Sequence, residues 1–442
     1  MPLTDDDAVE ALRSALSFPT IADEDPSRTD HAPFDALIAD LAERFPALHA
    51  AAEPTRIAGD ALLLRWRGET DEAPLVLMGH LDVVPVNPDD AWTHPPFGGV
   101  VEGGVVWGRG TLDCKGSVIA ICAAVERLVE RGVTPRRDVW LSFGCDEEVS
   151  GVAARTAVEE LRRQDVEPWF VLDEGGTVAS QAFPGVERPL AVIGVTEKGT
   201  VDLELHATAV GGHASMPPRT GAGERLARAI LRLQRHPFPA RLPEPTVEML
   251  ETVSAQATGP MRIALANAAR LRRPLALAFA RLGPETAAMT RTTTAVTELR
   301  GAPAANVLAA TASATVNMRV MVGDTVASAV ERVRRVIADE AVTVRVRSAD
   351  EPSPLSPTDD PAYRLIADTV RQVMPDAVPV PYVMMAATDS RHFHRVWPRV
   401  YRFNPFRMTP GQRESLHNVD ERLEVGSFLE GIRWYQRLLE GL

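Results

Sequence analysis

The sequence contains very little lysine and very little cysteine. Its 442 residues include only two lysines, Lys115 and Lys198, so nearly all of the 47 basic residues are arginine. The three cysteines, Cys114, Cys122 and Cys145, do not have the spacing of a zinc finger or of a disulfide framework. A fold built on either is therefore excluded, and we expect reduced thiols in a cytoplasmic protein.

Long apolar runs are also missing. None approaches the ~18 residues of a membrane span, and residues 1–20 carry acidic groups where a secretory signal would be basic. The 60 acidic residues exceed the 47 basic ones and give a net charge of −13. A field of that sign disfavours nucleic acid and anionic membranes as partners. Hydrophobic residues make up 45% and charged residues 24%, as in ordinary globular proteins.

The chain length predicts two or three domains. Up to residue 191, buried-strand patterns alternate with helical patterns, which is typical of an α/β fold with a mainly parallel sheet wrapped by helices. Further on, strand, helix, two strands, helix and strand follow one another, as in a ferredoxin-like α+β domain. We therefore predict a first domain with parts at 1–191 and 351–442, an inserted domain at 192–350, and an extra insertion within it at about 237–290.

Three predicted buried strands run into side chains that bind metals. The three clusters are His80-Leu81-Asp82, Asp146-Glu147-Glu148 and Asp173-Glu174. Because ligands of open α/β sheets lie beyond the carboxyl ends of the strands, we expect the clusters to meet in one crevice. A fourth acid, Asp113, lies in a glycine-flanked turn just before a predicted helix, where the helix dipole favours a carboxylate.

Each cluster has an ordinary interpretation as a turn or as the start of a helix. Together they place so much negative charge in one crevice that a cation is needed to neutralise it. Histidine and carboxylate without paired cysteines suit Zn²⁺, Mn²⁺ or Co²⁺ in a catalytic site. The ligands are too many for one tetrahedral ion and suit two ions that share a carboxylate and a water, an arrangement used for amide hydrolysis.

Several motifs, in order along nearly the whole chain, resemble a known family. They are MGHLDVVP at 78–85, GRGTLDCKG at 108–116, DEE at 146–148, GGHAS at 211–215, NVL at 306–308, VNMR at 316–319 and TDSR at 388–391. They are similar to the signature of the di-zinc exopeptidases, the family of aminoacylase, glutamate carboxypeptidase and carboxypeptidase S. The segment 171–176 resembles the carboxypeptidase S branch in particular.

The resemblance implies roles for residues on the metal side. The metal ligands would be His80 and Asp173 for one Zn²⁺, Glu148 and His417 for the other, and Asp113 as the bridge. Asp82 would orient the His80 imidazole, and Glu147 would be the general base. His392 and His394 are the rival histidines, although their spacing favours packing or exposure.

On the substrate side, the resemblance implies that Arg319 and Asn306 bind a terminal carboxylate. His213 would polarise the scissile carbonyl, often from a partner subunit, so a homodimer through the inserted lid domain is expected. The family frequently has Gly-Gly where this chain has Ala386-Ala387, and the two added Cβ atoms would narrow or reshape the carboxylate contact there.

The leading hypothesis is a two-metal hydrolase that cleaves an amide beside a free carboxylate, in short peptides or N-acyl amino acids. A non-catalytic, metal-dependent binder of such compounds is the alternative, but neither Glu147 nor any ligand is missing. A third hypothesis is an amidohydrolase for substrates that lack the carboxylate, and Arg319 and Asn306 argue against it.

Overall fold

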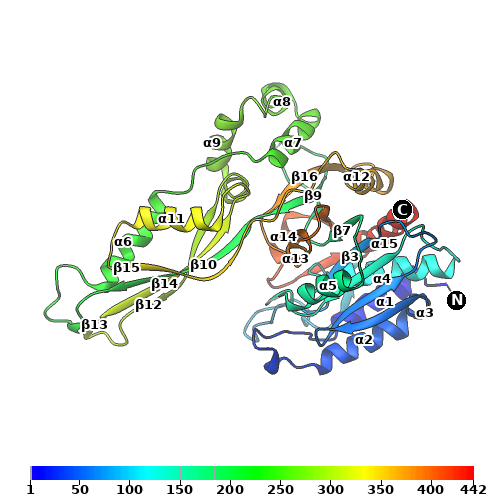
Figure 1. Ribbon diagram of the computed structural model, residues 1–442, viewed down its shortest axis with the longest axis horizontal. Coiled ribbons are helices and arrows are strands. Elements are labelled where there is room, and N and C mark those ends of the chain that lie inside the picture. Colours follow the sequence, from blue (N-terminus) through cyan, green and yellow to red (C-terminus); the bar gives the residue numbers. More distant parts are fainter. Residues whose placement is uncertain (1, 150, 184) are drawn as a thin grey trace.

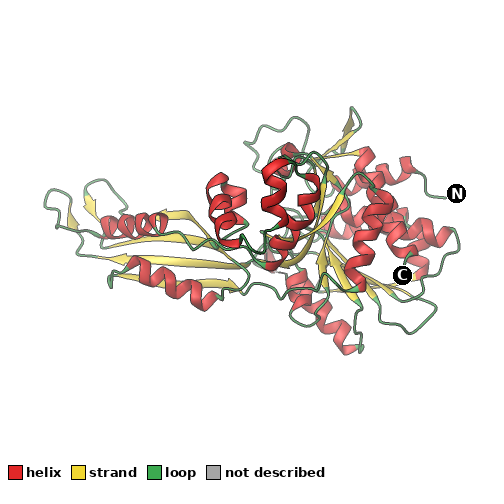
Figure 2. Cartoon of the chain, turned by 90° about the horizontal axis from the view of Figure 1, so that it is seen from above, coloured by secondary structure: helices red, strands yellow, loops and turns green. Residues whose placement is uncertain are grey.

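The computed structural model describes residues 2–149, 151–183 and 185–442 and contains two separate large sheets. In Figure 1 the blue N-terminal and red C-terminal segments lie together on the right, and the green and yellow middle of the chain extends to the left. Figure 2 shows that this middle part forms a narrow arm. Among the described residues, no helix combines the length and apolar character needed to cross a membrane.

The central sheet is mixed, with a parallel core. Its strands in spatial order are β1 (Ala52–Ile57), β2 (Ala61–Trp66), β6 (Val139–Gly144), β3 (Leu75–His80), β7 (Phe170–Asp173), β17 (Val400–Arg402), β9 (Leu190–Glu197), β8 (Thr177–Ala179) and β18 (Arg407–Met408), with β16 (Val378–Met384) paired to β9. The four strands β6, β3, β7 and β17 are mutually parallel. The predicted mainly parallel sheet is thus confirmed at the centre, while β1 and β2 run antiparallel to their neighbours and β9 runs antiparallel to β17 and β8.

Helices cover both faces of this sheet. Successive side chains of a strand point to opposite faces, so each strand contributes to two cores. Leu75 and Leu77 of β3 pack in one core, whereas Val76 and Met78 pack in another. The first core is covered by α1 (Asp5–Leu16), α2 (Ala32–Arg44), α3 (Pro46–Ala51), α4 (Lys115–Glu130), α12 (Pro361–Val373) and α15 (Val425–Glu440). The second is covered by α5 (Val152–Arg163) and α13 (Ser390–His394).

The arm has the predicted ferredoxin-like topology. Its antiparallel sheet has the order β12 (Thr293–Arg300), β14 (Thr311–Val320), β10 (Gly199–Thr208) and β15 (Val342–Asp350). Its core is closed by α6 (Ala222–Arg235) and α11 (Val326–Ile337). The expected boundary before residue 192 falls inside β9, which belongs to the central sheet; the chain passes between the sheets at Lys198.

Smaller elements complete the structure. They are η1 (Pro26–Arg28), the sheet of β4 (Val100–Glu102), β5 (Val105–Trp107) and β19 (Arg422–Glu424), the pair β11 (Gly212–His213) and β13 (Val307–Leu308), and α14 (Pro410–Ser415). The insertion forms α7 (Glu244–Val253), η2 (Ser254–Gln256), α8 (Gly259–Ala266), α9 (Arg272–Leu282) and α10 (Pro284–Ala288). Its apolar side chains pack against β16 of the central sheet, so the insertion is a packed helical unit.

Candidate metal centre

Three neighbouring parallel strands bring the predicted ligands to one edge of the central sheet. β3 ends at His80, β7 ends at Asp173, and β6 ends at Gly144, shortly before Glu148. His80 pairs with Gly144 in register, so the strands end at the same level. In Figure 1, β3 and β7 lie side by side at the centre of the right-hand domain.

Asp113 lies between two imidazole rings at this edge. Its Oδ1 is 3.0 Å from His80 Nε2, and its Oδ2 is 2.9 Å from His417 Nε2. His417 Nε2 is also 3.3 Å from Glu148 Oε1. The ligand atoms of His80, Asp113 and Glu148 lie within 4.8 Å of one another. A carboxylate with one oxygen directed at each histidine has the arrangement of a bridging ligand.

Asp82 connects the two sides of the cluster. Its Oδ1 is 3.4 Å from His80 Nδ1, which also lies 2.9 Å from the Asp82 carbonyl oxygen. Its Oδ2 accepts the Glu148 N–H at 3.0 Å. Because acceptors surround Nδ1, that nitrogen carries the proton and Nε2 keeps a lone pair for a metal.

Asp173 supplies the test of whether a metal fits. Its Oδ2 accepts the Ser390 N–H at 2.9 Å, whereas Oδ1 is buried and has no hydrogen-bond partner in the described part of the chain. A buried carboxylate oxygen without a donor is costly unless a cation neutralises it. The donor set therefore fits a pair of divalent ions.

The pKa values of the side chains at this edge of the sheet also reflect the concentration of negative charge there. Hydrogen bonds to Asp113 and Glu148 raise the pKa of His417 to about 10. Burial would raise the pKa of Asp113, but hydrogen bonds from His417 and His80 more than offset it and lower that pKa. Burial raises the pKa of Glu147 well above its usual value. The carboxylates around His80 and His417 therefore favour positive charge at this place, as they would favour a bound cation.

Glu147 lies apart from its neighbour Glu148. It is largely buried, and its Oε1 is 3.8 Å from Arg391 Nη1. Burial also raises the pKa of nearby Asp389 to about 8. A carboxyl group whose ionised form is disfavoured can both take and return a proton near neutral pH, as a general base must.

The substrate-side residues are divided between two places. Arg319 lies near the end of β14, paired with Thr200 at the beginning of β10. His213 in β11 and Asn306 next to β13 are exposed and adjacent, since Ala214 N–H donates to the Asn306 carbonyl oxygen at 3.1 Å. Figure 1 places β13 at the outer tip of the arm, opposite the central sheet. One chain therefore does not bring His213 and Asn306 to its own metal cluster.

The rival histidines are packing residues. His392 and His394 are buried in α13, where burial lowers their pKa values to about 3 and about 2. His394 Nε2 is 3.2 Å from Ser356 Oγ, and its Nδ1 is 3.2 Å from Arg402 Nη1. Neither ring belongs to the metal cluster described here.

The sequence reasoning missed two supports of the site. Glu421 is fully buried, and its Oε1 accepts the backbone N–H groups of Gly110, Leu112 and Asp113 at 2.8–3.2 Å. Its Oε2 accepts a 2.7 Å hydrogen bond from Arg109. Its position four residues after the predicted ligand His417 is the one signal in the sequence that could have found it.

The second support holds the turn that begins at Thr388. Glu197 Oε1 accepts hydrogen bonds from the Thr388 hydroxyl at 2.7 Å and from Arg402 Nε at 2.9 Å. The same turn supplies the Ser390 N–H that binds Asp173. No local pattern links Glu197 with Arg402, since 205 positions separate them in the sequence.

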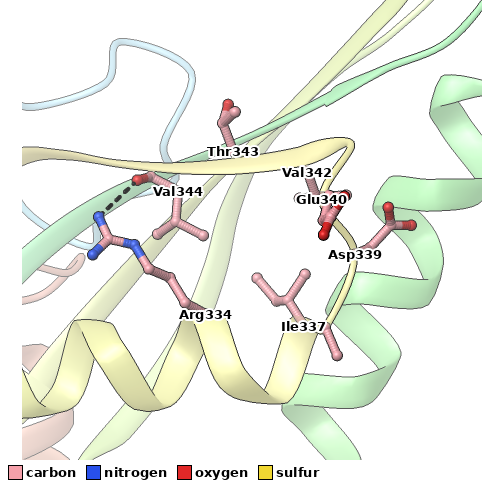
Figure 3. A pocket seen from close by; sticks show the side chains of 8 residues that line it. Arg334, Ile337, Asp339, Glu340, Val342, Thr343 and Val344 are labelled. Carbon is pink, nitrogen blue, oxygen red and sulfur yellow. Dashed lines mark hydrogen bonds between the residues drawn. The ribbon is translucent and has the colours of Figure 1, made fainter.

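A surface hollow of about 640 Å³ lies elsewhere, between the end of α11 and β15. Figure 3 shows Arg334 reaching from the helix to the Val344 carbonyl oxygen at its rim. None of its lining residues is a predicted site residue, so the hollow plays no part in the metal site.

Histidine and carboxylate ligands at the carboxyl edge of an α/β sheet, with a buried glutamate beside them, define a metal-dependent hydrolase. Residues 76–441 match the model of peptidase family M20/M25/M40, and the chain belongs to this family.

Two relatives and one solved structure are similar over most of the chain. The probable carboxypeptidase S-like 2 of Dictyostelium discoideum is 35% identical over 99% of this chain and 85% of its own. The human N-fatty-acyl-amino acid synthase/hydrolase PM20D1 is 37% identical over 83% of this chain and 74% of its own. The M20 metallo-carboxypeptidase Sso-CP2 of Sulfolobus solfataricus is 16% identical, with a TM-score of 0.73 over 98% of both chains, and supports the fold.

Proposed function

We propose that this protein hydrolyses an amide or peptide bond next to a free carboxylate, in N-acyl amino acids or short peptides. The observation that carries the proposal is Asp113, held between His80 and His417 at 3.0 and 2.9 Å, with the buried Glu147 nearby. The names of the relatives support both substrate classes, because one is carboxypeptidase S-like and another is an N-fatty-acyl-amino acid hydrolase.

The residues of this chain would divide the reaction between them. When bound, two divalent ions polarise the scissile carbonyl and lower the pKa of the attacking water. His80 and Asp173 would hold one ion, Glu148 and His417 the other, and Asp113 both. Glu147 takes a proton from the water and passes it to the leaving nitrogen, while Asp82 keeps the His80 ring in the binding tautomer.

We propose Zn²⁺ as the native ion, with Co²⁺ or Mn²⁺ able to substitute. Imidazole and carboxylate ligands without thiolates support this choice. Reconstitution of metal-free protein with each ion in turn, followed by turnover measurements, compares them directly. A protein active only with Mg²⁺ would contradict the proposal.

A substrate panel tests the activity itself. Metal-loaded protein is assayed with dipeptides, N-acetyl amino acids and N-acyl amino acids of increasing chain length. We expect hydrolysis of at least one class with a free carboxylate, and much slower hydrolysis of its carboxamide analogues. Tight binding of these compounds without any turnover would instead support the non-catalytic binder.

The position of His213 supports a homodimer in which each arm completes the partner's site. His213 and Asn306 lie at the tip of the arm, and Val210, Met216 and Val307 near them are exposed apolar side chains. Covering these side chains with a second subunit would stabilise the assembly and bring an imidazole donor to the scissile carbonyl.

The predicted cytoplasmic location also remains a proposal. It is supported by three buried cysteines without disulfide bonds. Fractionation of the source cells, followed by an assay for metal-dependent hydrolysis of the best substrate, checks it; activity confined to the extracellular fraction would contradict it.

A further inference from the structure

One rung of the arm's sheet, a row of paired residues across adjacent strands, lies next to the central domain. Thr200 pairs with Arg319 on one side and with Asp350 on the other. Directly paired residues of adjacent strands point to the same face, so these three side chains share a face. β10 begins at Gly199 and β15 ends at Asp350, which places the rung where the arm joins the central sheet. With strands spaced by about 4.8 Å, Arg319 and Asp350 are about 10 Å apart across the rung.

Arg391 connects this rung with the general base. Its Nε is 3.7 Å from Asp350 Oδ2, and its Nη1 is 3.8 Å from Glu147 Oε1. Both distances exceed those of hydrogen bonds. Nη1 donates to the Thr388 carbonyl oxygen at 2.8 Å, whereas Nε is buried and has no hydrogen-bond partner among the described residues. The guanidinium therefore lies beside Glu147, and its Nε–H donor has no acceptor among the described residues.

Arg319 is a second arginine that has no hydrogen bond to a carboxylate. Within the described part of the chain it makes no ion pair, and the nearby Asp202 already accepts from Asn317 at 2.8 Å and from Ser348 at 3.1 Å. Burial lowers the pKa of Arg319, and the positive charge of Arg391 lowers it further. Glu147, Asp350 and Asp389 lie 3.7–4.0 Å from Arg391, whereas no ion pair is formed by Arg319 among the described residues, so an anion that reaches both guanidinium groups would be stabilised by both charges.

We propose that Arg319 and Arg391 of one chain bind the substrate's free carboxylate between them. This inference rests on the proposed function and adds Arg391 as a specificity-determining residue. In an amino acid, the carboxylate carbon lies about 2.5 Å from the nitrogen. A leaving nitrogen that receives its proton from Glu147 therefore brings the carboxylate next to Arg391. Two guanidinium groups on one carboxylate can satisfy all of its lone pairs.

The decisive experiment compares an N-acyl amino acid with its primary carboxamide. Arg391→Gln is expected to lower kcat/KM for the acid by about ten- to a hundredfold, the effect of one charge-assisted hydrogen-bonded pair, and to leave the carboxamide unchanged. Arg391→Lys should recover part of the loss. Arg395→Gln is the matched control, because Arg395 also contacts Asp350 but makes no contact with Glu147 in the described structure. This control should leave the ratio of kcat/KM for the acid to kcat/KM for the carboxamide unchanged.

A binding measurement separates this inference from the proposed function. Calorimetry of metal-loaded protein with the free amino acid product should show a Kd that Arg391→Gln raises by the same factor, with no change for the amino acid amide. If the wild type hydrolyses neither substrate, the proposed function fails, and the calorimetry still decides whether Arg391 binds the carboxylate. An equal loss for acid and carboxamide, or no loss of carboxylate affinity, would overturn the role of Arg391.

Discussion

Adjacent side chains with the same chemistry do different things in this site. The backbone N–H of Glu148 is bound by Asp82 at 3.0 Å, and its carboxylate lies 3.3 Å from His417. Glu147 faces Arg391 instead and is largely buried, which raises its pKa. In the proposed mechanism, the turn after β6 thus separates a metal ligand from a proton carrier.

Substitution of the two glutamates should separate these roles. Glu147→Gln should keep both metals and lose turnover by about a hundredfold or more, because only the proton transfer is removed. Glu148→Gln should lower the metal content itself, since an amide oxygen carries no charge for the ion. Elemental analysis and kcat on the same samples check both; two variants that retain full metal and full rate would contradict the assignment.

The buried histidines of α13 predict how stability depends on pH. His392 and His394 have folded-state pKa values of about 3 and about 2, against 6.5 in an unfolded chain. Below pH 6.5 the unfolded state therefore binds more protons than the folded state, and the free energy of unfolding falls as the pH falls. Each ring contributes a slope of up to about 1.4 kcal/mol per pH unit.

Urea unfolding of metal-free protein between pH 6.5 and 5 measures this slope. His394→Gln should reduce it by about 1 kcal/mol per pH unit, because glutamine does not titrate. The comparison with the wild type cancels the contributions of His80 and His417. An unchanged slope would show that folding does not lower the pKa of His394.

At the scale of elements, a turn and the helix after it position the Asp113 carboxylate. Residues 108–113 wrap around the buried Glu421 carboxylate, and α4 then begins at Lys115. A Cβ at Gly116 would meet the Thr111 carbonyl oxygen at 2.1 Å, so only glycine lets the helix start this close to the turn. The spacing between Asp113 and α4 therefore depends on this contact.

Two glycine-to-alanine substitutions in helices test this dependence. Gly116→Ala should push the turn away, lower metal affinity and destabilise the protein. Gly223→Ala in α6 is the matched control, because its Cβ would meet nothing within 4 Å. The control should stabilise the helix by up to about 1 kcal/mol and leave metal binding unchanged. Thermal unfolding and metal titration check both; equal behaviour of the two variants would contradict the packing argument.

The elements also show what could be predicted from the sequence. The runs that end at His80 and Asp173 are short and apolar, so both the strands and their shared edge could be predicted. The stretch 192–209 reads as one strand, although β9 is buried nearly throughout and β10 alternates between buried and half-buried residues. That change in pattern marks the passage between sheets, but the contacts that hold it, such as Glu197 with Arg402, are remote in sequence and could not be predicted.

At the scale of the whole molecule, the arm separates two groups of proposed substrate-binding residues. Arg319 lies at its base, beside the central domain of its own chain, and His213 lies at its tip. This arrangement makes sense if each site takes Arg319 from its own chain and His213 from a partner.

Mixing two inactive variants tests the shared site. Glu147→Gln and His213→Ala chains are combined under conditions of demonstrated subunit exchange. A mixed dimer has one complete site, so activity should rise to about a quarter of the wild-type value for random pairing. No recovery would place His213 in its own chain's site or outside the chemistry.

The central claim is that two metal ions per chain support hydrolysis, and one titration tests it most directly. Metal-free protein receives Zn²⁺ in steps, with bound metal and turnover measured in each sample. We predict no turnover without metal and full turnover as bound metal approaches two per chain, the number that five ligands with a bridging Asp113 support. Undiminished turnover in metal-free protein, or saturation of turnover at one ion with no second ion bound, would contradict the account.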